Sequence, residues 1–406
     1  MNAFLKVDRS ELRHDRPPVM LLGGINLVRA LGLARIPAII ASPEAYTPAM
    51  ASRYCSGRCL LPPLAQREAV VERLMRAGEL LSDAVGSRIP LFYGDDDYLG
   101  LIQDHVAELG KHYALLLNPV SLSRALHSKE LFQALAESRG LPVPARLDFP
   151  VLDKFHGPVL VKPKMKTDWE GSAVYHQLFA HAGKARIFAN GLEASQNELV
   201  RRMAGELQFQ EYVPGDDRSL WSFHGFADEK SELVEWFVGR KIRTHPALTG
   251  DSTYLELAHD DELAALGRDL VRRIGLRGVF KMDFKRHADT GRFYLLEINA
   301  RFNLWHYLGA ANGVNLPQVA YEYLTRRVKR PHVPASTTYR WLSLKLDLRA
   351  YRREKLNTLE WLGSLLAAPK VYDLWSWSDP LPALADLRQY VPRARKKMMR
   401  WLSTAS

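Results

Sequence analysis

Short apolar runs alternate with helical periodicity over the first part of the chain. Residues 19–22 (VMLL) form an apolar run that ends at Gly23-Gly24, a helical pattern continues to Gly32, and a second apolar run follows at 36–42 (IPAIIAS). Strand, glycine turn, helix and strand in this order predict a βαβ unit with parallel strands. The first 120 residues are therefore expected to form an α/β domain.

Three consecutive aspartates follow the next strand. The apolar run 89–94 (IPLFYG) precedes Asp95-Asp96-Asp97 and a predicted helix over about 97–109. Aspartates at this place can bind a metal, but more often they cap a helix and complement its positive end. The glycine turn leaves helix N–H groups free for an anion, whereas the missing GxGxxG argues against a dinucleotide site.

The pattern changes near residue 120. Residues 121–140 are helical and end at Gly140, before two prolines in 141–146, which indicates a domain junction. A helix is predicted at 268–275. Further strands are predicted at 158–163, 207–213, 232–243, 277–284 and 292–302. Their hairpin character predicts an α+β region after this junction.

One hairpin, within 279–301, carries the main chemical signal. Asp289-Thr290-Gly291 suits a three-residue loop, and folding about Thr290 pairs positions whose numbers sum to 580. Asp283 then faces Glu297 directly. Strict alternation places Lys281 beside Asp283, and Phe293, Leu295, Glu297 and Asn299 together on one face.

Two close carboxylates repel each other and are costly to bury without compensation. A Mg²⁺ ion removes this conflict because it takes oxygen ligands, and Asn299 offers a third oxygen. A hairpin whose polar face meets solvent is the alternative. Leu295, expected beside Glu297, argues against that alternative because it continues the apolar pattern on both faces.

Five segments in order resemble the ATP-grasp family. Glu297-Ile298-Asn299-Ala300-Arg301 is similar to its E-x-N-x-R strand, and Asp283 stands where the family carries its first metal-binding acid. Lys162 and Lys129 resemble its two nucleotide-binding lysines. The segment 210–215 (QEYVPG) resembles its interdomain hinge. The resemblance therefore implies an ATP-grasp domain of two lobes over 121–325, with the hinge near 207–217. The resemblance covers roughly residues 19–325, with the first domain as the one preceding the ATP-grasp lobes.

Within the family, the acidic pair after the hinge and FVGRKIR (237–243) resemble carboxylate–amine ligases similar to D-aspartate ligase. This resemblance implies that ATP phosphorylates a carboxylate and that an amine then displaces phosphate. It implies ATP with Mg²⁺ or Mn²⁺, and small carboxylate and amine substrates of amino-acid type. The implied metal ligands are Asp283, Glu297 and Asn299. The implied nucleotide contacts are Lys129, Lys162, Gln210, Glu211, Tyr212, Val213 and Asp217. The implied catalytic residues are Arg240, Lys241, Arg243 and Arg301.

Two features depart from the family pattern. Asp216 is an alternative to Asp217 as the ribose contact, and the spacing from the hinge is short. The loop 164–172 contains only Gly171, together with Lys164, Lys166 and Trp169. It is therefore expected to contact phosphates through its lysines more than through backbone N–H groups.

Composition narrows the class of protein. The chain has 47% hydrophobic and 25% charged residues, as in ordinary globular proteins. No apolar run reaches the roughly 18–20 residues that span a bilayer, and the first residues lack the apolar stretch of a signal peptide. The two cysteines, Cys55 and Cys59, exclude a disulfide framework and a four-cysteine zinc site. A cytoplasmic protein is expected.

The charge imbalance lies entirely in the last fifth of the chain. The net charge is +11, and residues 326–406 hold 17 basic and 6 acidic residues, a surplus of 11. This predicted mainly helical extension also contains five of the nine tryptophans. Three roles stay open for this extension. It can pack against the body or a second copy in a homodimer, or dock to a membrane or acidic partner. Binding of nucleic acid is the least favoured of the three. A non-catalytic ATP-binding protein that docks through this tail is the alternative function.

Overall fold

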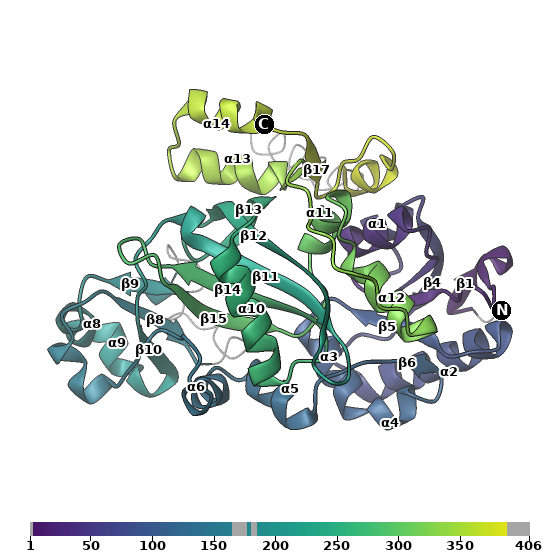
Figure 1. Ribbon diagram of the computed structural model, residues 1–406, viewed down its shortest axis with the longest axis horizontal. Coiled ribbons are helices and arrows are strands. Elements are labelled where there is room, and N and C mark those ends of the chain that lie inside the picture. Colours follow the sequence, from purple (N-terminus) through teal and green to yellow (C-terminus); the bar gives the residue numbers. More distant parts are fainter. Residues whose placement is uncertain (1–2, 165–176, 180–184, 388–406) are drawn as a thin grey trace, which may run out of the picture.

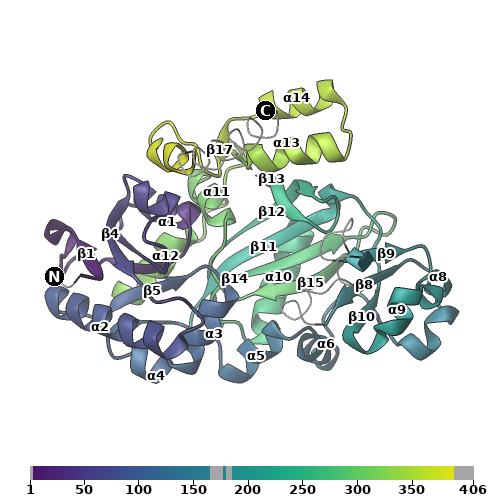
Figure 2. The same ribbon diagram turned by 180° about the vertical axis from the view of Figure 1, so that it is seen from behind.

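The computed structural model describes residues 3–164, 177–179 and 185–387. The predicted loop 164–172, apart from Lys164, lies outside these residues, and so does the end of the basic extension from residue 388 onward. The described residues form three β-sheets, with six, four and seven strands. Figures 1 and 2 show the six-stranded sheet at one end of the molecule, the four-stranded sheet at the other, and the seven-stranded sheet between them.

The N-terminal sheet has the order β1-β4-β3-β2-β5-β6, and every neighbouring pair is parallel except β1 with β4. Its strands are β1 (Leu5–Val7), β2 (Val19–Leu22), β3 (Ala38–Ser42), β4 (Cys55–Leu60), β5 (Ile89–Tyr93) and β6 (Tyr113–Ala114). Its helices are α1 (Ile25–Leu33), α2 (Arg67–Val85), α3 (Asp96–Asp104) and α4 (Val106–Leu109). β2 is buried on both faces, because Val19 and Leu21 join one hydrophobic cluster and Met20 and Leu22 join another.

The aspartates after β5 have different hydrogen-bond partners. Asp95 caps α3, since its Oδ1 accepts a hydrogen bond from the Tyr98 amide at 2.8 Å, and the capping expectation is confirmed for this residue. Asp96 instead binds Arg301, which lies 205 positions further along the chain. The acidic turn is thus both a helix cap and a contact between two sheets.

The small lobe is built on the four-stranded sheet β7-β10-β8-β9. Its strands are β7 (Arg146–Leu147), β8 (Val159–Pro163), β9 (Arg186–Phe188) and β10 (Leu207–Glu211). The helices of this region are α5 (Val120–His127), α6 (Lys129–Ser138), α8 (Gly191–Gln196) and α9 (Glu198–Arg202). The helical pattern over 121–140 forms two helices, because Ser128 is extended and its Oγ accepts the Leu131 amide to cap α6.

The central sheet has the order β15-β14-β11-β12-β13-β16-β17, and only β16 and β17 are parallel. Its strands are β11 (Leu220–Ala227), β12 (Leu233–His245), β13 (Asp251–Leu257), β14 (Gly278–Arg286), β15 (Phe293–Asn299), β16 (Arg340–Leu342) and β17 (Lys370–Tyr372). The remaining helices are α10 (Asp261–Ile274), α11 (Trp305–Ala311), α12 (Leu316–Arg326), α13 (Leu344–Arg353) and α14 (Thr358–Leu366). Residues beyond 326 therefore contribute two strands to the same sheet as the predicted metal hairpin.

A β-bulge corrects the predicted faces of the hairpin. Asp283 pairs with Glu297 as expected, but the register then shifts and Phe284 pairs with Leu295, which leaves Leu296 as an extra residue. Phe293 and Leu295 are consequently buried in the core with Met282 and Phe284. The expectation that these two side chains share a face with Glu297 was wrong, because strict alternation does not survive an inserted residue.

A buried ion pair joins the C-terminal segment to α1. Nε of Arg29 lies 3.0 Å from Oδ2 of Asp379, and both side chains are only 1% exposed. Arg29 also donates to the carbonyls of Tyr372, Asp373 and Leu374, and Asp379 accepts hydrogen bonds from Ser52 and the Arg53 amide. The segment around 372–379 is therefore packed against the body of the protein.

We expect Arg29→Met to lower the free energy of unfolding by about 3–5 kcal/mol, because it leaves a buried carboxylate without its counter-charge. Urea denaturation would measure the change. Arg67→Met is the matched control, since Arg67 and Asp104 form an exposed pair (44% and 59% exposed) that contributes about 0–1 kcal/mol. Equal losses in the two variants would contradict the assignment.

Candidate active site

Asp283 lies at the centre of a charged cluster on one face of the central sheet. Its Oδ2 is 2.5 Å from Nζ of Lys281, and its Oδ1 accepts a hydrogen bond from Ser222 of β11 at 2.7 Å. Burial alone would raise the pKa of Asp283, but the charges of Lys281 and Lys241 hold it well below its usual value. Asp283 is therefore ionised and shielded by lysines.

The second carboxylate and the amide follow on β15. Glu297 is exposed and lies directly across from Asp283, and its Oε1 accepts a hydrogen bond from Nδ2 of Asn299 at 3.1 Å. Oδ1 of Asn299 accepts from Arg301 at 3.3 Å. The structure thus brings together the three predicted metal ligands on one face of the ribbon. Within the described residues, no group of three or more His, Cys, Asp or Glu side chains is placed to hold a metal, so this site has only two carboxylates and an amide to offer one.

Arg301 connects this ribbon to the N-terminal sheet. Its Nε donates to Oδ1 of Asp96 at 2.7 Å, and its NH1 reaches the carbonyl of Gly94 at 3.4 Å. Burial would lower the pKa of Arg301, but the hydrogen bond and charge of Asp96 raise it. Arg301 is thereby fixed between two domains at the end of the E-x-N-x-R segment.

The small lobe contributes two lysines. Nζ of Lys162 on β8 donates to Oε1 of Gln210 at 3.2 Å, and Nζ of Lys129 on α6 donates to the carbonyl of Pro163 at 2.5 Å. Burial, together with the charge of Lys129, lowers the pKa of Lys162 to about 8, while the charge of Glu297 opposes this shift. Lys129, Lys162 and Glu297 therefore act on one another electrostatically across the two lobes.

The predicted hinge, near 207–217, begins with β10 and continues beyond it. The amides of Glu211 and Tyr212 donate to the carbonyls of Ala145 and Pro158, and Val213 is buried. The hydroxyl of Tyr212 accepts from Nζ of Lys285 at 2.8 Å, which ties the hinge to β14. Burial lowers the pKa of Lys285 to about 8, although Asp217 and Asp216 act against this.

The two aspartates after the hinge already serve as structural acceptors. Asp216 caps a short 3-10 helix by accepting the Ser219 amide at 3.1 Å. Asp217 accepts the amide and hydroxyl of Thr244 and the amide of Leu248, at 2.6–2.8 Å. Asp217 therefore holds the turn that follows β12, and neither aspartate is distinguished by these contacts as the ribose ligand.

The three basic residues on β12 differ in where they point. Lys241 belongs to the cluster, because burial lowers its pKa while the charges of Asp283 and Glu297 oppose the shift. Arg240 forms a 2.6 Å ion pair with Glu256 of β13 and lies over the ring of Trp221. Arg243 forms two hydrogen bonds with Asp347 of α13, at 2.9 and 3.0 Å. The structure thus brings Lys241, but not the guanidinium of Arg243, to the carboxylates.

Lys281, Lys285 and Ser222 were given no role from sequence, and Asp96 was expected only as a helix cap or metal ligand, not as a partner of Arg301. The position of Lys281 two residues before Asp283 was a usable signal, because alternation puts the two side chains on one face. Lys285 lies on the same strand, two residues after Asp283, so the same signal applied to it. Ser222 and Asp96 approach from another strand and another sheet, so no local pattern pairs them with Asp283.

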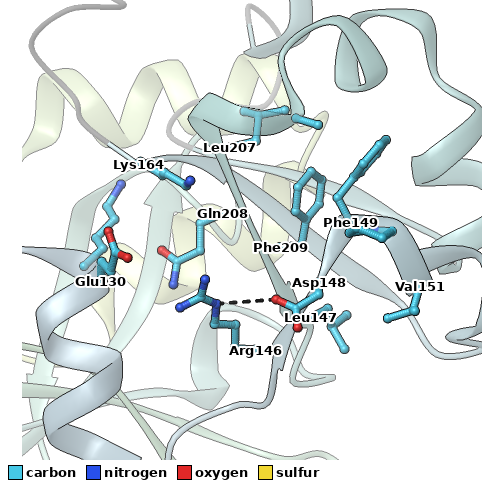
Figure 3. A pocket seen from close by; sticks show the side chains of 13 residues that line it. Glu130, Arg146, Leu147, Asp148, Phe149, Val151, Lys164, Leu207, Gln208 and Phe209 are labelled. Carbon is cyan, nitrogen blue, oxygen red and sulfur yellow. Dashed lines mark ion pairs between the residues drawn. The ribbon is translucent and has the colours of Figure 1, made fainter.

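A cavity of about 490 Å³ lies beside α6 and the small lobe, and Lys129 is among the residues that line it. Figure 3 shows Glu130 and Lys164 on one side of it, together with Arg146 and Asp148, which form an ion pair of 3.9 Å. Lys129 thus borders this cavity as well as the carbonyl of Pro163.

A second cavity, of about 370 Å³, lies at the carboxyl ends of β2, β3 and β5. Gly23, Gly24, Thr47, Asp95 and Tyr98 are among the residues that line it. Gly94 also lines it and accepts a hydrogen bond from Arg301, so this cavity lies close to the end of the E-x-N-x-R segment.

Comparisons with known proteins agree with this geometry. Residues 207–345 match the family model described as ATP-grasp in the biosynthetic pathway with Ter operon. The chain is 23% identical to D-aspartate ligase of Enterococcus faecium over 302 residues, covering 69% of this chain and 68% of that enzyme. It is 26% identical over 220 residues to D-alanine–D-alanine ligase of Xylella fastidiosa, covering 49% of this chain and 66% of that enzyme.

Solved structures show the same fold. The L-amino acid ligase of Bacillus licheniformis superposes with a TM-score of 0.53 at 14% identity, over 77% of this chain and 74% of that one. N5-carboxyaminoimidazole synthetase of Staphylococcus aureus gives a TM-score of 0.58 at 11% identity, over 80% of this chain and 81% of that one. Together the comparisons support an ATP-grasp enzyme that is similar to carboxylate–amine ligases, and they do not favour a non-catalytic ATP-binding protein. Among the described residues, none of the helices combines the length and apolar character that crossing a bilayer requires.

The depressed pKa of Lys162 predicts proton uptake when nucleotide binds. Near pH 8 a fraction of Lys162 is neutral, and a nearby polyphosphate favours the charged form and so raises its pKa. Calorimetric titration with ATP at pH 8, in buffers of different ionisation enthalpy, would measure this uptake. We expect less uptake at pH 6 and less in Lys162→Met, while Lys154→Met, an exposed lysine of the same lobe, leaves it unchanged. Uptake that Lys162→Met does not alter would contradict the prediction.

Proposed function

We propose that this protein is an ATP- and Mg²⁺-dependent ligase that joins a carboxylate to an amine, with an amino acid as at least one substrate. The observation that carries the proposal is the placement of Asp283 opposite Glu297, with lysines from both lobes around them. The similarity to D-aspartate ligase and to L-amino acid ligase supports the substrate class.

The donor set suits a hard divalent cation. Asp283, Glu297 and Asn299 present two carboxylates and an amide on one face, and Mg²⁺ or Mn²⁺ takes oxygen ligands of this kind. When bound, such an ion neutralises charge between phosphate oxygens. Lys281 now contacts Oδ2 of Asp283, so this ammonium group must give way to the ion or share the carboxylate with it.

The surrounding cations suit a polyphosphate. We assign phosphate contacts to Lys129, Lys162 and Arg301, since Lys162 is coupled electrostatically to both Lys129 and Glu297, and Arg301 bonds to Asn299. The adenine contact is assigned to the hinge 210–213. Since the amides of Glu211 and Tyr212 already donate within the small lobe, the base is expected to meet carbonyl groups and the amide of Val213. Asp217 or Asp216 would meet the ribose.

The reaction proceeds in two displacements. A carboxylate oxygen attacks the γ-phosphorus, the bond between that phosphorus and the β,γ-bridging oxygen breaks, and ADP leaves with the electron pair. The neutral amine then attacks the acyl carbon, the carbon–oxygen bond to phosphate breaks, and the amine proton passes to phosphate or water. Lys241 beside the carboxylates is assigned to stabilise the negative charge that develops on the transferred group.

Arg240 and Arg243 take lesser parts in this proposal. Arg240 retains a place near the acid substrate because its guanidinium is partly exposed at the ion pair with Glu256. Arg243 acts through position, since its contacts with Asp347 fix the end of β12 that carries Lys241. We assign it no contact with substrate.

The small substrate is assigned to the N-terminal side of the site. The 370 Å³ cavity lies next to Gly94, which Arg301 contacts, and it is of a size that fits an amino acid. In this division, residues 1–120 supply a substrate domain, 121–325 bind and cleave ATP, and 326–406 form a basic extension. The parallel strands of β2, β3 and β5 open toward this cavity, where ligands of α/β sheets commonly bind.

A panel of carboxylate and amine pairs tests the function. Phosphate release from ATP would be measured for each amino acid alone and for each pair, and products would be identified by mass spectrometry. We expect release that requires both a carboxylate and an amine, with an amide product. ATP binding without pair-dependent release from any combination would refute the ligase assignment.

The carboxylate ribbon has its own test. Asp283→Asn and Glu297→Gln should retain adenine-nucleotide binding but lower the turnover rate by at least about a hundredfold, because each removes a charged metal ligand. Asp289→Asn is the control, since Asp289 is exposed at the tip of the same hairpin. Turnover retained by Glu297→Gln would contradict the metal assignment.

A further inference from the structure

The α13–α14 pair forms an exposed platform on one side of the molecule. Figures 1 and 2 show both helices standing beyond the central sheet, at the same end as the segment that follows β17. Eight of the twenty exposed large apolar side chains of the described residues lie within 344–387. Exposed apolar surface of this density marks an interaction site more often than chance placement.

A leucine stripe runs along the outer face of α14. We use this name for Leu359, Leu362 and Leu366, which lie three and four positions apart and therefore share one side of the helix. Leu359 is 80% exposed and Leu366 is 85% exposed. No side chain of α14 is fully buried, although the sequence of this helix is strongly apolar.

The inner face of α14 is fixed, so the helix cannot turn its leucine stripe inward. Nε1 of Trp361 donates to Oδ2 of Asp347 at 2.8 Å, and the hydroxyl of Tyr254 donates to the carbonyl of Ser364 at 2.7 Å. Arg243 donates to both Asp347 and the Ser364 hydroxyl. Rotation of α14 would break these bonds, and the stripe must therefore face outward.

A second set of apolar side chains lies beyond β17 at the same end of the molecule. Trp377 is 87% exposed, more than any other large apolar residue described. Leu381, Leu384 and Leu387 are also exposed and recur every three residues. Tryptophan and leucine at the outer surface are typical of segments that enter the interfacial layer of a bilayer.

The helix and the turn that precede α14 carry exposed cations. Arg349, Arg352 and Arg353 of α13 and Lys355 of the connecting turn are all exposed, and the structure records no ion pair for them within the described residues. The exposed acids of this stretch are Glu354 and Glu360. The extension that carries them has a surplus of 11 positive charges over 326–406.

We propose that the α13–α14 platform docks the protein on the surface of an anionic membrane, together with the segment 374–387. The leucine stripe and the exposed arginines of α13 would make the contact. The charge favours lipid over a second copy, because a two-fold interface would bring the same arginines face to face. It also accounts for the excess of exposed cations over exposed acids in this stretch, since acidic headgroups attract the cations while the leucines and Trp377 enter the headgroup boundary. The protein would then lie on the membrane without crossing it.

Vesicle sedimentation tests the proposal with the full chain. We expect the protein to pellet with vesicles of phosphatidylcholine mixed with phosphatidylglycerol, and not with phosphatidylcholine alone, and the bound fraction to fall as salt rises. Leu359→Glu/Leu366→Glu should lower the partition coefficient about tenfold, because it replaces apolar contacts with charges that the lipid repels. Leu192→Glu, an exposed leucine of α8 on the small lobe, is the control and should bind as the unmodified chain does.

A second pair of variants tests the contribution of the positive charges to membrane binding. Arg352→Gln/Arg353→Gln should weaken binding and its salt dependence, whereas Arg201→Gln/Arg202→Gln, two exposed arginines of α9, should not. Thermal unfolding confirms that each variant is folded. Failure of the unmodified protein to bind the mixed vesicles, or undiminished binding by the leucine variant, would overturn the proposal. A dimer in analytical ultracentrifugation that the leucine variant dissociates would also overturn it in favour of self-association.

Discussion

The site depends on positive charges that offset the repulsion between two carboxylates on one β-ribbon. Asp283 and Glu297 lie opposite each other on neighbouring strands. Lys281 and Lys241 supply the positive charge that keeps the buried Asp283 ionised. Without these lysines, one carboxylate would be protonated or the ribbon would be strained by repulsion. With them, the face carries more cations than anions, which suits a site for a polyphosphate and a metal.

A single inserted residue allows the same ribbon to serve a core and a site. Leu296 is the extra residue of the bulge, so Leu295 enters the core while Glu297 stays opposite Asp283 on the other face. Bulges commonly redirect side chains beside active sites. β15, which has seven residues, therefore packs apolar side chains into the core on one face and presents the predicted metal ligands on the other.

The basic extension is continuous with the rest of the structure. β16 and β17 extend the central sheet, Asp379 meets Arg29 of the N-terminal domain, and Asp347 holds Arg243 of β12. The same Arg243–Asp347 pair fixes the end of a site strand and the inner face of α14. The helix that carries the leucine stripe is therefore connected, through Arg243 and Asp347, to the strand that carries Lys241.

The sequence alone determined the elements whose signal is local. Alternation and the Asp289-Thr290-Gly291 loop were enough to pair Asp283 with Glu297, and the ordered motifs were enough to indicate an ATP-grasp enzyme. Only the tertiary structure decided which charges meet. Arg243 binds Asp347, 104 positions away, Arg301 binds Asp96, 205 positions away, and one extra residue in β15 moved Leu295 into the core. Spacing along a chain reports on neighbours within one element, whereas these partners are set by how separate elements pack.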